Sequence, residues 1–272
     1  MTALNPNQKS STGDLGVLLR HWRKVRGRSQ FDLSNDTGVS QRHISFIESG
    51  RSAPSRHMLI EIAQALDVPL RDRNALLLAA GFAPIYSEGA WDAAEMQSVT
   101  GALRRMLRQH EPFPALVMDR YWNVLMANES APRFFNCFID MAARQGPRNM
   151  LHLIFDPNGL RPFVANWEIT AKSLLERVNR ESVGRVVDIK TRQLLAELSA
   201  YPDVKSEWKA PQTDNVLPIV PLGFVKDGQV LNYFSMVATV GTPQTVAAQE
   251  LRIESMFPAD DRTEARHLEM LG

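Results

Sequence analysis

The sequence predicts a chain of more than one domain, in which a small all-α domain of five helices precedes a larger α+β domain with an antiparallel sheet. The length supports two domains, because 272 residues exceed the roughly 150 residues of an ordinary single domain. Apolar residues recur at helical spacing through 14–80, whereas strand-like apolar runs flank helical stretches beyond residue 95. Glycine and proline residues at 81–94 separate these patterns and predict a linker.

The charge is also divided unevenly along the chain. Lys and Arg total 31 and Asp and Glu total 30, so the formal net charge of +1 excludes a basic coat over the whole molecule. Residues 1–86 nevertheless hold 11 basic against 7 acidic side chains, and residues 20–56 hold 8 against 3. A local basic excess attracts a polyanion over about 8–10 Å. The sequence therefore predicts a basic first domain and a mildly acidic remainder.

Apolar spacing and capping residues mark the five helices expected within 14–80. The first helix carries an apolar stripe at positions i, i+3, i+4 and i+7, formed by Leu15, Leu18, Leu19 and Trp22. The second helix is expected between Ser29, a good N-cap residue, and Gly38, which suits a left-handed C-terminal conformation. Ser40 and Gly50 delimit the third helix, and Pro54-Ser55 precede the fourth. The fifth helix is expected at about 70–80. Residues 1–13 are expected to form a disordered tail.

The second and third helices have the lengths and the tight glycine turn of a helix-turn-helix. The outer face of the third helix carries Gln41, Arg42, Ser45 and Phe46. Glutamine can pair bidentately with adenine, arginine can pair with guanine, and an apolar side chain can contact a thymine methyl group. The start of the second helix, at Ser29 and Gln30, offers backbone amides that suit a phosphate. This pattern predicts DNA binding.

Residues 14–80 resemble the XRE family, the Cro/C1-type helix-turn-helix with a lambda-repressor-like fold. The motifs that carry the resemblance are Ser29-Gln30, Gly38-Val39-Ser40, Ile44-Ser45, Gly50-Arg51 and Pro54-Ser55. The resemblance implies a double-stranded DNA operator as partner, with Gln41, Arg42 and Phe46 at base edges. Phosphate contacts are implied for Ser29, Gln30, Ser49 and Arg51. A structural ion pair is implied between Arg23 and Glu48.

The second domain is expected to have strands at both ends and helices between them. Its first part predicts a helix at Glu95–His110, strands at Ala115–Met118 and Asn123–Ala127, and a helix beginning near Glu129. Long helices are expected at about 160–182 and 188–200. Asp227-Gly228, between the apolar runs Val216–Val225 and Val230–Val240, is typical of a β-hairpin turn. Leu251–Phe257 predicts a further strand.

Residues 95–272 resemble the MmyB-like ligand-binding domain found behind XRE modules, a PAS-like fold. The resemblance is carried by scattered residues, including Pro114-Ala115-Leu116-Val117, Trp122, Asn149-Met150-Leu151, Trp208, Gly241-Thr242-Pro243-Gln244 and Glu250-Leu251-Arg252-Ile253-Glu254. It implies an antiparallel sheet flanked by helices around an interior that accepts a small apolar effector, such as a fatty-acid-like molecule. The residues expected to line this interior are Trp122, Phe134, Phe135, Trp167, Tyr233, Phe234 and Met236. These residues would equally suit an ordinary core.

The leading hypothesis is a transcriptional regulator that binds its operator as a homodimer and senses a small molecule through the second domain. The alternative is a second domain that serves as an oligomerisation or partner-binding scaffold, as in an antitoxin, without a small-molecule ligand. A DNA-tethered enzyme is disfavoured, because Cys137 and His152 lack a recognisable orienting motif. The sequence contains no His-Glu-x-x-His motif and no paired Cys or His spacing for zinc. No catalytic residue, cofactor or metal is expected.

The cysteine content and the hydropathy indicate a cytoplasmic protein. Cys137 is the single cysteine, so an internal disulfide is excluded and a reducing compartment is favoured. The N-terminus lacks the apolar stretch of a signal peptide. The longest uncharged apolar run, Ala75–Tyr86, is too short for a bilayer, which requires about 18 residues or more.

Overall fold

The computed structural model describes residues 8–183, 189–205 and 222–271, which form two compact units. The first, called the helical unit below, holds residues up to Gly89 together with the segment Thr242–Gln249. The second, called the sheet unit, holds Ala90–Ser182 and most of the chain that follows. The break after Gly89 falls within the expected linker at 81–94. Each unit is described by itself.

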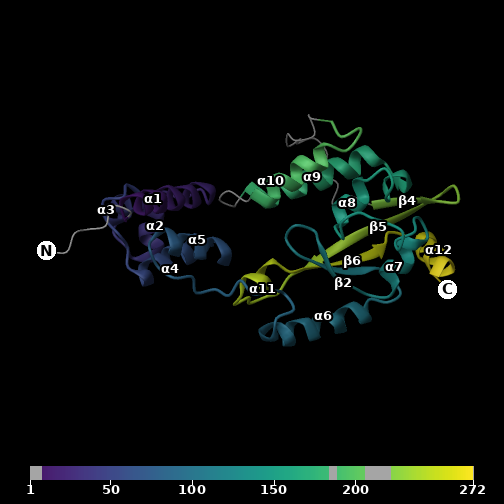
Figure 1. Cartoon of the computed structure of the whole chain (residues 1–272), viewed down its shortest axis with the longest axis horizontal. Helices are drawn as coiled ribbons and strands as arrows, with labels where there is room; N and C mark the ends of the chain where they lie inside the picture. The colour runs from purple at the N-terminus through teal and green to yellow at the C-terminus, as the bar shows by residue number, and fades with distance from the viewer. Residues whose placement is uncertain (1–7, 184–188, 206–221, 272) are drawn as a thin grey trace. The chain divides into compact units, whose positions relative to one another are not determined.

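The helical unit contains the five helices that the sequence predicts (Figure 1, purple to blue). They are α1 (Gln8–Val25), α2 (Gln30–Thr37), α3 (Gln41–Glu48), α4 (Arg56–Ala65) and α5 (Leu70–Ala79). The Ser29 hydroxyl accepts from the Asp32 backbone N–H, and the Asp32 carboxylate accepts from the Ser29 N–H, which forms a capping box. Gly38 adopts φ 70°, the left-handed conformation expected at the end of α2.

The apolar stripes of these helices meet in one core. Its fully buried members include Leu15, Trp22, Leu33, Ile47, Leu59, Ile62 and Leu66. Gly16 allows α1 to approach the end of α3, because a Cβ atom there would lie 2.4 Å from the Glu48 carbonyl oxygen. Helix α1 starts earlier than predicted, so 8–13 are helical rather than a disordered tail. That stretch has no apolar periodicity to reveal a helix, and residues 1–7 lie outside the described residues.

A segment from late in the sequence completes the helical unit. Pro69 precedes α5 but provides no side-chain cap. Instead, the Leu70 backbone N–H donates to the side-chain oxygen of Gln249 at 2.7 Å. Val246, at the start of α11 (Val246–Glu250), is fully buried, and its N–H donates to the Ser87 carbonyl at 2.9 Å. The connection between two late strands therefore packs against α5 and the end of the first domain.

The sheet unit contains a six-stranded antiparallel sheet. Its strands are β1 (Ala115–Met118), β2 (Val124–Ala127), β3 (Val164–Ala165), β4 (Leu222–Lys226), β5 (Gln229–Ala238) and β6 (Arg252–Pro258). They lie in the order β2-β1-β6-β5-β4-β3, so the first and last strands in sequence pair with each other. The predicted hairpin is confirmed, because Asp227 and Gly228 turn between β4 and β5 with φ of 50° and 73°. Residues 216–221 of the expected strand lie outside the described residues.

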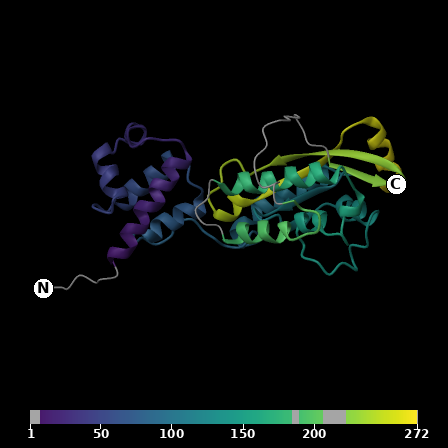
Figure 2. The same ribbon diagram turned by 90° about the horizontal axis from the view of Figure 1, so that it is seen from above.

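Helices cover the sheet, with α9 and α10 along one side and α6 along the other (Figure 1). Figure 2 shows α9 and α10 running beside each other. The helical segments are η1 (Ala94–Met96), α6 (Gln97–Gln109), α7 (Ser130–Asn136), α8 (Met150–Phe155), η2 (Arg161–Phe163), α9 (Trp167–Val183), α10 (Ile189–Ser199) and α12 (Asp261–Leu271). The helix expected from 160 begins only at Trp167, because a 3-10 turn and the short strand β3 occupy 161–165. No described helix is long and apolar enough to cross a membrane.

Candidate functional site

The outer face of α3 presents the four residues expected at base edges. Gln41 and Arg42 are exposed, and Ser45 and Phe46 are half-buried. The guanidinium carbon of Arg42 lies 5.3 Å from the centre of the Phe46 ring. Arg51, beyond the helix end, lies 5.9 Å from the same ring. This face therefore carries two arginine guanidinium groups around one aromatic ring, a combination suited to bases and phosphates together.

The residues expected at phosphates lie at the start of α2 and just after α3. Ser29 caps α2 and is exposed, as are Ser49 and Arg51. The Gln30 side-chain amide donates to a Glu48 carboxylate oxygen at 2.9 Å. The Ser49 hydroxyl donates to the Phe46 carbonyl at 3.2 Å. The expected phosphate residues thus border the outer face of α3, and Gln30 also links α2 to α3.

Arg23 on α1 and Glu48 on α3 form the expected ion pair. Two bonds join them, from Arg23 Nε to Glu48 Oε1 at 2.6 Å and from a terminal nitrogen to Oε2 at 2.9 Å. Burial alone would raise the pKa of Glu48, but the hydrogen bonds from Arg23 and Gln30 lower it below its ordinary value. The pair fixes α3 against α1 and holds the outer face of α3 in one orientation.

The sheet unit contains a cavity of about 270 Å³ between α9 and the strands. Small-molecule pockets commonly span roughly 300–1,000 Å³, so this cavity is near the lower end of that range. Its lining is mostly apolar and comprises Leu116, Trp122, Met150, Ile154, Thr170, Ser173, Leu174, Glu176, Arg177, Leu222, Tyr233, Phe234, Ser235, Glu254 and Met256. Three of the seven residues expected there, Trp122, Tyr233 and Phe234, line it.

The other four expected residues lie elsewhere. Phe134 and Phe135 of α7 are buried in the core, where the Phe134 ring contacts Phe224 and Phe138. Trp167 packs edge-on against Phe155, with ring centres 5.1 Å apart. Met236 is 60% exposed. Aromatic composition alone did not distinguish the wall of the cavity from the packed core around it.

A strained turn places Trp122 in the cavity wall. Trp122 has φ 68°, an unusual conformation for a bulky residue. The Asp119 carboxylate stabilises the turn by accepting from the Tyr121 and Asn123 backbone N–H groups at 2.8 and 3.0 Å. The Trp122 carbonyl accepts from the Met150 N–H at 2.9 Å, which joins the turn to α8. The indole is only 3% exposed as a result.

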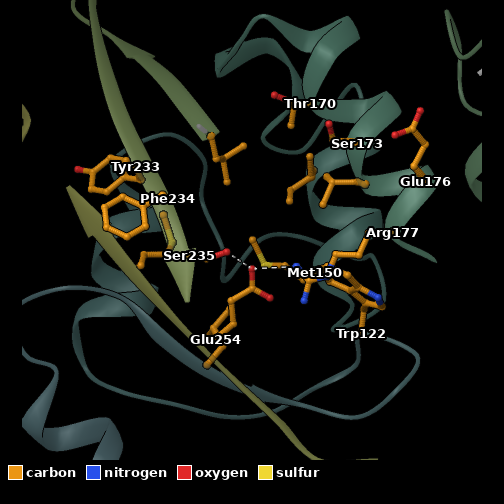
Figure 3. Close-up of a pocket in the computed structure, with 15 residues that line it drawn as sticks. Trp122, Met150, Thr170, Ser173, Glu176, Arg177, Tyr233, Phe234, Ser235 and Glu254 are labelled. Carbon is orange, nitrogen blue, oxygen red and sulfur yellow. Dashed lines mark hydrogen bonds and ion pairs between the residues drawn. The ribbon is translucent and has the colours of Figure 1, made fainter. Parts of the chain in front are cut away.

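A polar bridge crosses one side of this apolar cavity. Figure 3 shows the Glu254 carboxylate of β6 between Ser235 of β5 and Arg177 of α9. The Ser235 hydroxyl donates to Glu254 at 2.6 Å, whereas the closest Arg177 nitrogen lies 3.5 Å away. The Arg177 guanidinium also lies 4.4 Å from the centre of the Trp122 ring. Arg177 therefore contacts both the carboxylate and the indole.

Four buried polar atoms of the cavity lining have no hydrogen-bond partner among the described residues. They are Trp122 Nε1, Thr170 Oγ1, Glu176 Oε1 and Glu254 Oε2. Buried polar groups are nearly always paired, so each such atom requires an explanation. A bound molecule with both donor and acceptor capacity would supply the missing partners.

The sequence reasoning missed Arg177, Glu254 and Ser235. A signal for Glu254 was present, because Glu254 and Met256 alternate along one face of a strand that also carries apolar residues. Arg177 lies between Leu174, Leu175 and Val178 on a predicted amphipathic helix. A charged side chain at the margin of an apolar face is a weak signal, because long side chains commonly reach solvent from such positions.

Tyr233 lines the cavity, but its hydroxyl belongs to a structural network. It lies 2.8 Å from His267 Nδ1, while His267 Nε2 lies 3.0 Å from the Pro112 carbonyl. Because a carbonyl can only accept, Nε2 carries the proton and Nδ1 accepts from Tyr233. Burial raises the pKa of Tyr233 and lowers the pKa of His267, so both side chains stay neutral.

The residues weighed as a catalytic pair are engaged with other groups. The Cys137 thiol lies 3.4 Å from the Arg133 carbonyl, and burial raises its pKa. The ring nitrogens of His152 contact the Tyr201 hydroxyl at 3.0 Å and Glu197 at 3.2 Å. Within the described ranges, no cluster of three or more His, Cys, Asp or Glu side chains could hold a metal ion.

Two family models match the chain. Residues 19–72 match the helix-turn-helix family, and residues 99–270 match the MmyB-like transcription regulator ligand binding domain. Both families belong to transcription regulators rather than to enzymes. No curated protein matches the chain. The first match covers α2 and α3, and the second covers every residue that lines the cavity.

Proposed function

We propose that this chain, which belongs to the MmyB-like family of transcription regulators, binds operator DNA through α3 and that a small molecule in the cavity controls this binding. The chain is a helix-turn-helix DNA-binding transcription regulator with a ligand-binding domain. The observation that carries the proposal is the cavity, since it lies within the matched ligand-binding domain and contains buried polar atoms without partners.

For DNA, we place α3 in the major groove, which is about 12 Å wide. Gln41, Arg42, Ser45 and Phe46 would contact base edges, while Ser29, Gln30, Ser49 and Arg51 would contact phosphates. DNA-binding proteins of this class bind paired half-sites separated by about 34 Å, which favours a homodimer. We place this homodimer in the cytoplasm. The exposure of Gln41 and Arg42 supports these roles.

For the ligand, we propose a small molecule with a largely apolar body, like the chain of a fatty acid. Leucine, methionine, isoleucine and aromatic side chains form most of the cavity wall. Such pockets typically combine an apolar lining with a few polar groups that orient the ligand. Ser235, Glu254 and Arg177 would be those groups here.

The connection between β5 and β6 offers a route from the cavity to the DNA-binding helices. Phe234 and Ser235 of β5 and Glu254 and Met256 of β6 line the cavity. The chain between these strands includes Thr242–Gln249, and Gln249 caps α5. A ligand that changes the position of either strand would therefore act on the cap of α5. Allosteric coupling of this kind typically amounts to about 1–3 kcal/mol.

The test begins with protein purified from its own cells. Native mass spectrometry should show an additional small-molecule mass that disappears on denaturation. Operator DNA is recovered by genome-wide DNA immunoprecipitation. The dissociation constant of the protein–operator complex is then measured for protein stripped of the small molecule and for protein reloaded with the extracted molecule. We expect a change of about 5- to 150-fold. Absence of a small-molecule mass, or an unchanged dissociation constant, would overturn ligand control, and a co-purifying protein would favour the scaffold alternative.

Gln249→Ala tests the coupling route. Loss of a helix cap costs about 0.5–2 kcal/mol, so the helical unit should still fold. The variant should bind the extracted molecule normally, yet the effect of that molecule on operator affinity should fall to less than twofold. Gln244→Ala is the matched control, because Gln244 is an exposed residue of the same segment. An unaltered ligand response in Gln249→Ala would exclude the cap as the route.

A further inference from the structure

We infer that α6 carries a second DNA-binding surface, in which Arg104, Arg105 and Arg108 contact phosphates of the operator DNA. This surface belongs to the sheet unit and lies outside the helix-turn-helix. The inference rests on the proposed function, because it requires that the chain binds operator DNA through α3. It adds a contact that depends neither on the base sequence nor on the cavity.

One face of α6 is fixed against the sheet. Leu103 and Leu107 are buried on this face. The Asn128 side-chain amide donates to the Leu107 carbonyl at 3.4 Å, and His110 Nε2, directly after the helix, lies 2.7 Å from the Met256 carbonyl. Figure 1 shows α6 on the side of the sheet away from α9 and α10. The opposite face of α6 is therefore presented to solvent in a fixed orientation.

The exposed face of α6 is basic. Residues 97–110 contain three arginines, Arg104, Arg105 and Arg108, and no acidic residue. All three arginines are exposed. Arg104 and Arg108 are four residues apart, so they lie one turn apart on the same side of the helix, with Arg105 next to them. The helix therefore gathers three positive charges on one solvent-facing surface.

The positive charges of this surface are not compensated within the described part of the chain. No hydrogen bond or ion pair joins the three guanidinium groups to another described residue. Five other arginines of the sheet unit each pair with a carboxylate, namely Arg120, Arg144, Arg161, Arg177 and Arg266. Like charges at this helical spacing repel each other. An anion bound at the surface would remove the repulsion.

Duplex DNA matches this surface in charge and spacing. DNA carries one negative charge per about 1.7 Å of its axis, so several phosphates can face guanidinium groups spread over one helical turn of about 5.4 Å. Arginine can also form two parallel hydrogen bonds to one phosphate.

The helix-turn-helix brings DNA within reach of α6. Helix α5 ends at Ala79 and α6 begins at Gln97. The connecting residues 80–96 can span at most about 60 Å, so both units remain close to any DNA that α3 binds. Attachment to a DNA-bound unit raises the effective concentration of phosphates around α6, so contacts that are weak individually can form.

The experiment measures how the affinity of the full chain for operator DNA depends on salt. The probe is a duplex of about 40 base pairs that contains the operator, and the salt concentration is varied from about 50 to 200 mM. Each phosphate contact contributes about 1 to the slope of log Kd against log salt concentration. In the triple variant Arg104→Gln, Arg105→Gln and Arg108→Gln, we expect this slope to fall by about 2–3. The increase in Kd over this range should then be about 16- to 64-fold smaller than in the original protein.

Two control variants separate a specific surface from a general charge effect. The triple variant Arg148→Gln, Arg192→Gln and Arg262→Gln removes the same charge from exposed arginines on other parts of the sheet unit. This variant should keep the original slope. Replacement of the three α6 arginines by lysine retains their charge and should keep most of the slope.

Several results would overturn the inference. An unchanged slope in the α6 glutamine variant, with a native circular dichroism spectrum, would contradict it, and is the outcome expected if α6 binds an acidic protein instead. An equal decrease in the control with scattered substitutions would also contradict it. If the triple variant does not fold, Arg105→Gln alone should lower the slope by about 1, and an unchanged slope would again contradict the contact. Failure of the original protein to bind the operator would contradict the proposed function as well, whereas the other results contradict the inference alone.

Discussion

Two arginine–glutamate pairs, one in each unit, differ in how completely their carboxylates are hydrogen-bonded. In the helical unit, Arg23 holds both oxygens of Glu48 at 2.6 and 2.9 Å, and Gln30 donates a further bond to the same carboxylate. In the sheet unit, Arg177 approaches Glu254 only to 3.5 Å, and one oxygen of Glu254 has no partner within the described part of the chain. Both carboxylate oxygens are therefore hydrogen-bonded in the helical unit, whereas only one of them has a described partner in the sheet unit.

The difference indicates how each pair is used. A bidentate arginine–carboxylate pair with all its oxygens bonded defines the geometry of the elements that it joins. An incomplete pair on a cavity wall keeps hydrogen-bonding capacity for another molecule. The first pair orients α3, and we propose that the second helps to orient the ligand. Substitutions should separate these roles.

The largest effect is expected from Glu48→Ala. Removal of one partner from a buried ion pair leaves Arg23 uncompensated, and such changes cost about 3–5 kcal/mol. Urea-induced unfolding of the full chain, followed by circular dichroism, measures the loss in the helical unit. Glu254→Ala is the comparison variant and should lower the free energy of unfolding clearly less, because Arg177 makes a single, longer contact with Glu254. An equal or larger loss for Glu254→Ala would contradict the distinction between the two pairs.

A smaller effect, on DNA binding rather than on stability, is expected from Arg42→Ala. Arg42 is exposed and contacts Phe46, so the fold does not depend on it. If Arg42 pairs with a base, its removal should weaken operator binding by about 1–3 kcal/mol and leave binding to random DNA nearly unchanged. Fluorescence anisotropy with both DNAs measures the two affinities. Equal weakening on both would indicate a phosphate contact instead.

The smallest effect is expected from acid titration of Glu48. Its pKa is lowered in the folded protein by the bonds from Arg23 and Gln30, from an unfolded value of about 4.3. Its ionised form therefore stabilises the fold fully above about pH 4.3, and this contribution is lost as the pH falls through the folded pKa. The difference in unfolding free energy between the original protein and Glu48→Gln should be constant from pH 5 to 8 and shrink below pH 4. A difference that persists undiminished to pH 3 would exclude this titration.

Local signals made the helical unit predictable from the sequence. Ser29 and Gly38 act on residues within one helical turn, so the ends of α2 could be predicted without knowledge of the fold. The start of α1 was missed because residues 8–13 are polar and carry no periodic apolar signal. The Asp227-Gly228 hairpin was also local and was predicted correctly.

The cavity was only partly predictable, because it depends on contacts between distant parts of the chain. Arg177 and Glu254 are separated by 77 residues, and only the sheet order brings α9 and β6 together. Trp122 was expected at the ligand, but Phe134 was indistinguishable from it by composition and lies in the core. Short-range sequence patterns identify helices and strands, but they do not determine which buried side chains line a cavity.

The cap on α5 also determines where the protein can be divided. The helical unit is discontinuous in sequence, because Gln249 and Val246 join it from 150 residues or more beyond its other helices. A fragment that ends at residue 89 would lack the partner of the Leu70 N–H and would lose the buried Val246 side chain. Exchange of ligand-binding domains between related regulators should therefore preserve the match between α5 and the incoming Thr242–Gln249 segment. A chimera that joins the domains only at the linker would take α5 from one protein and the Thr242–Gln249 segment from the other, so the two sides of this contact would no longer come from the same sequence.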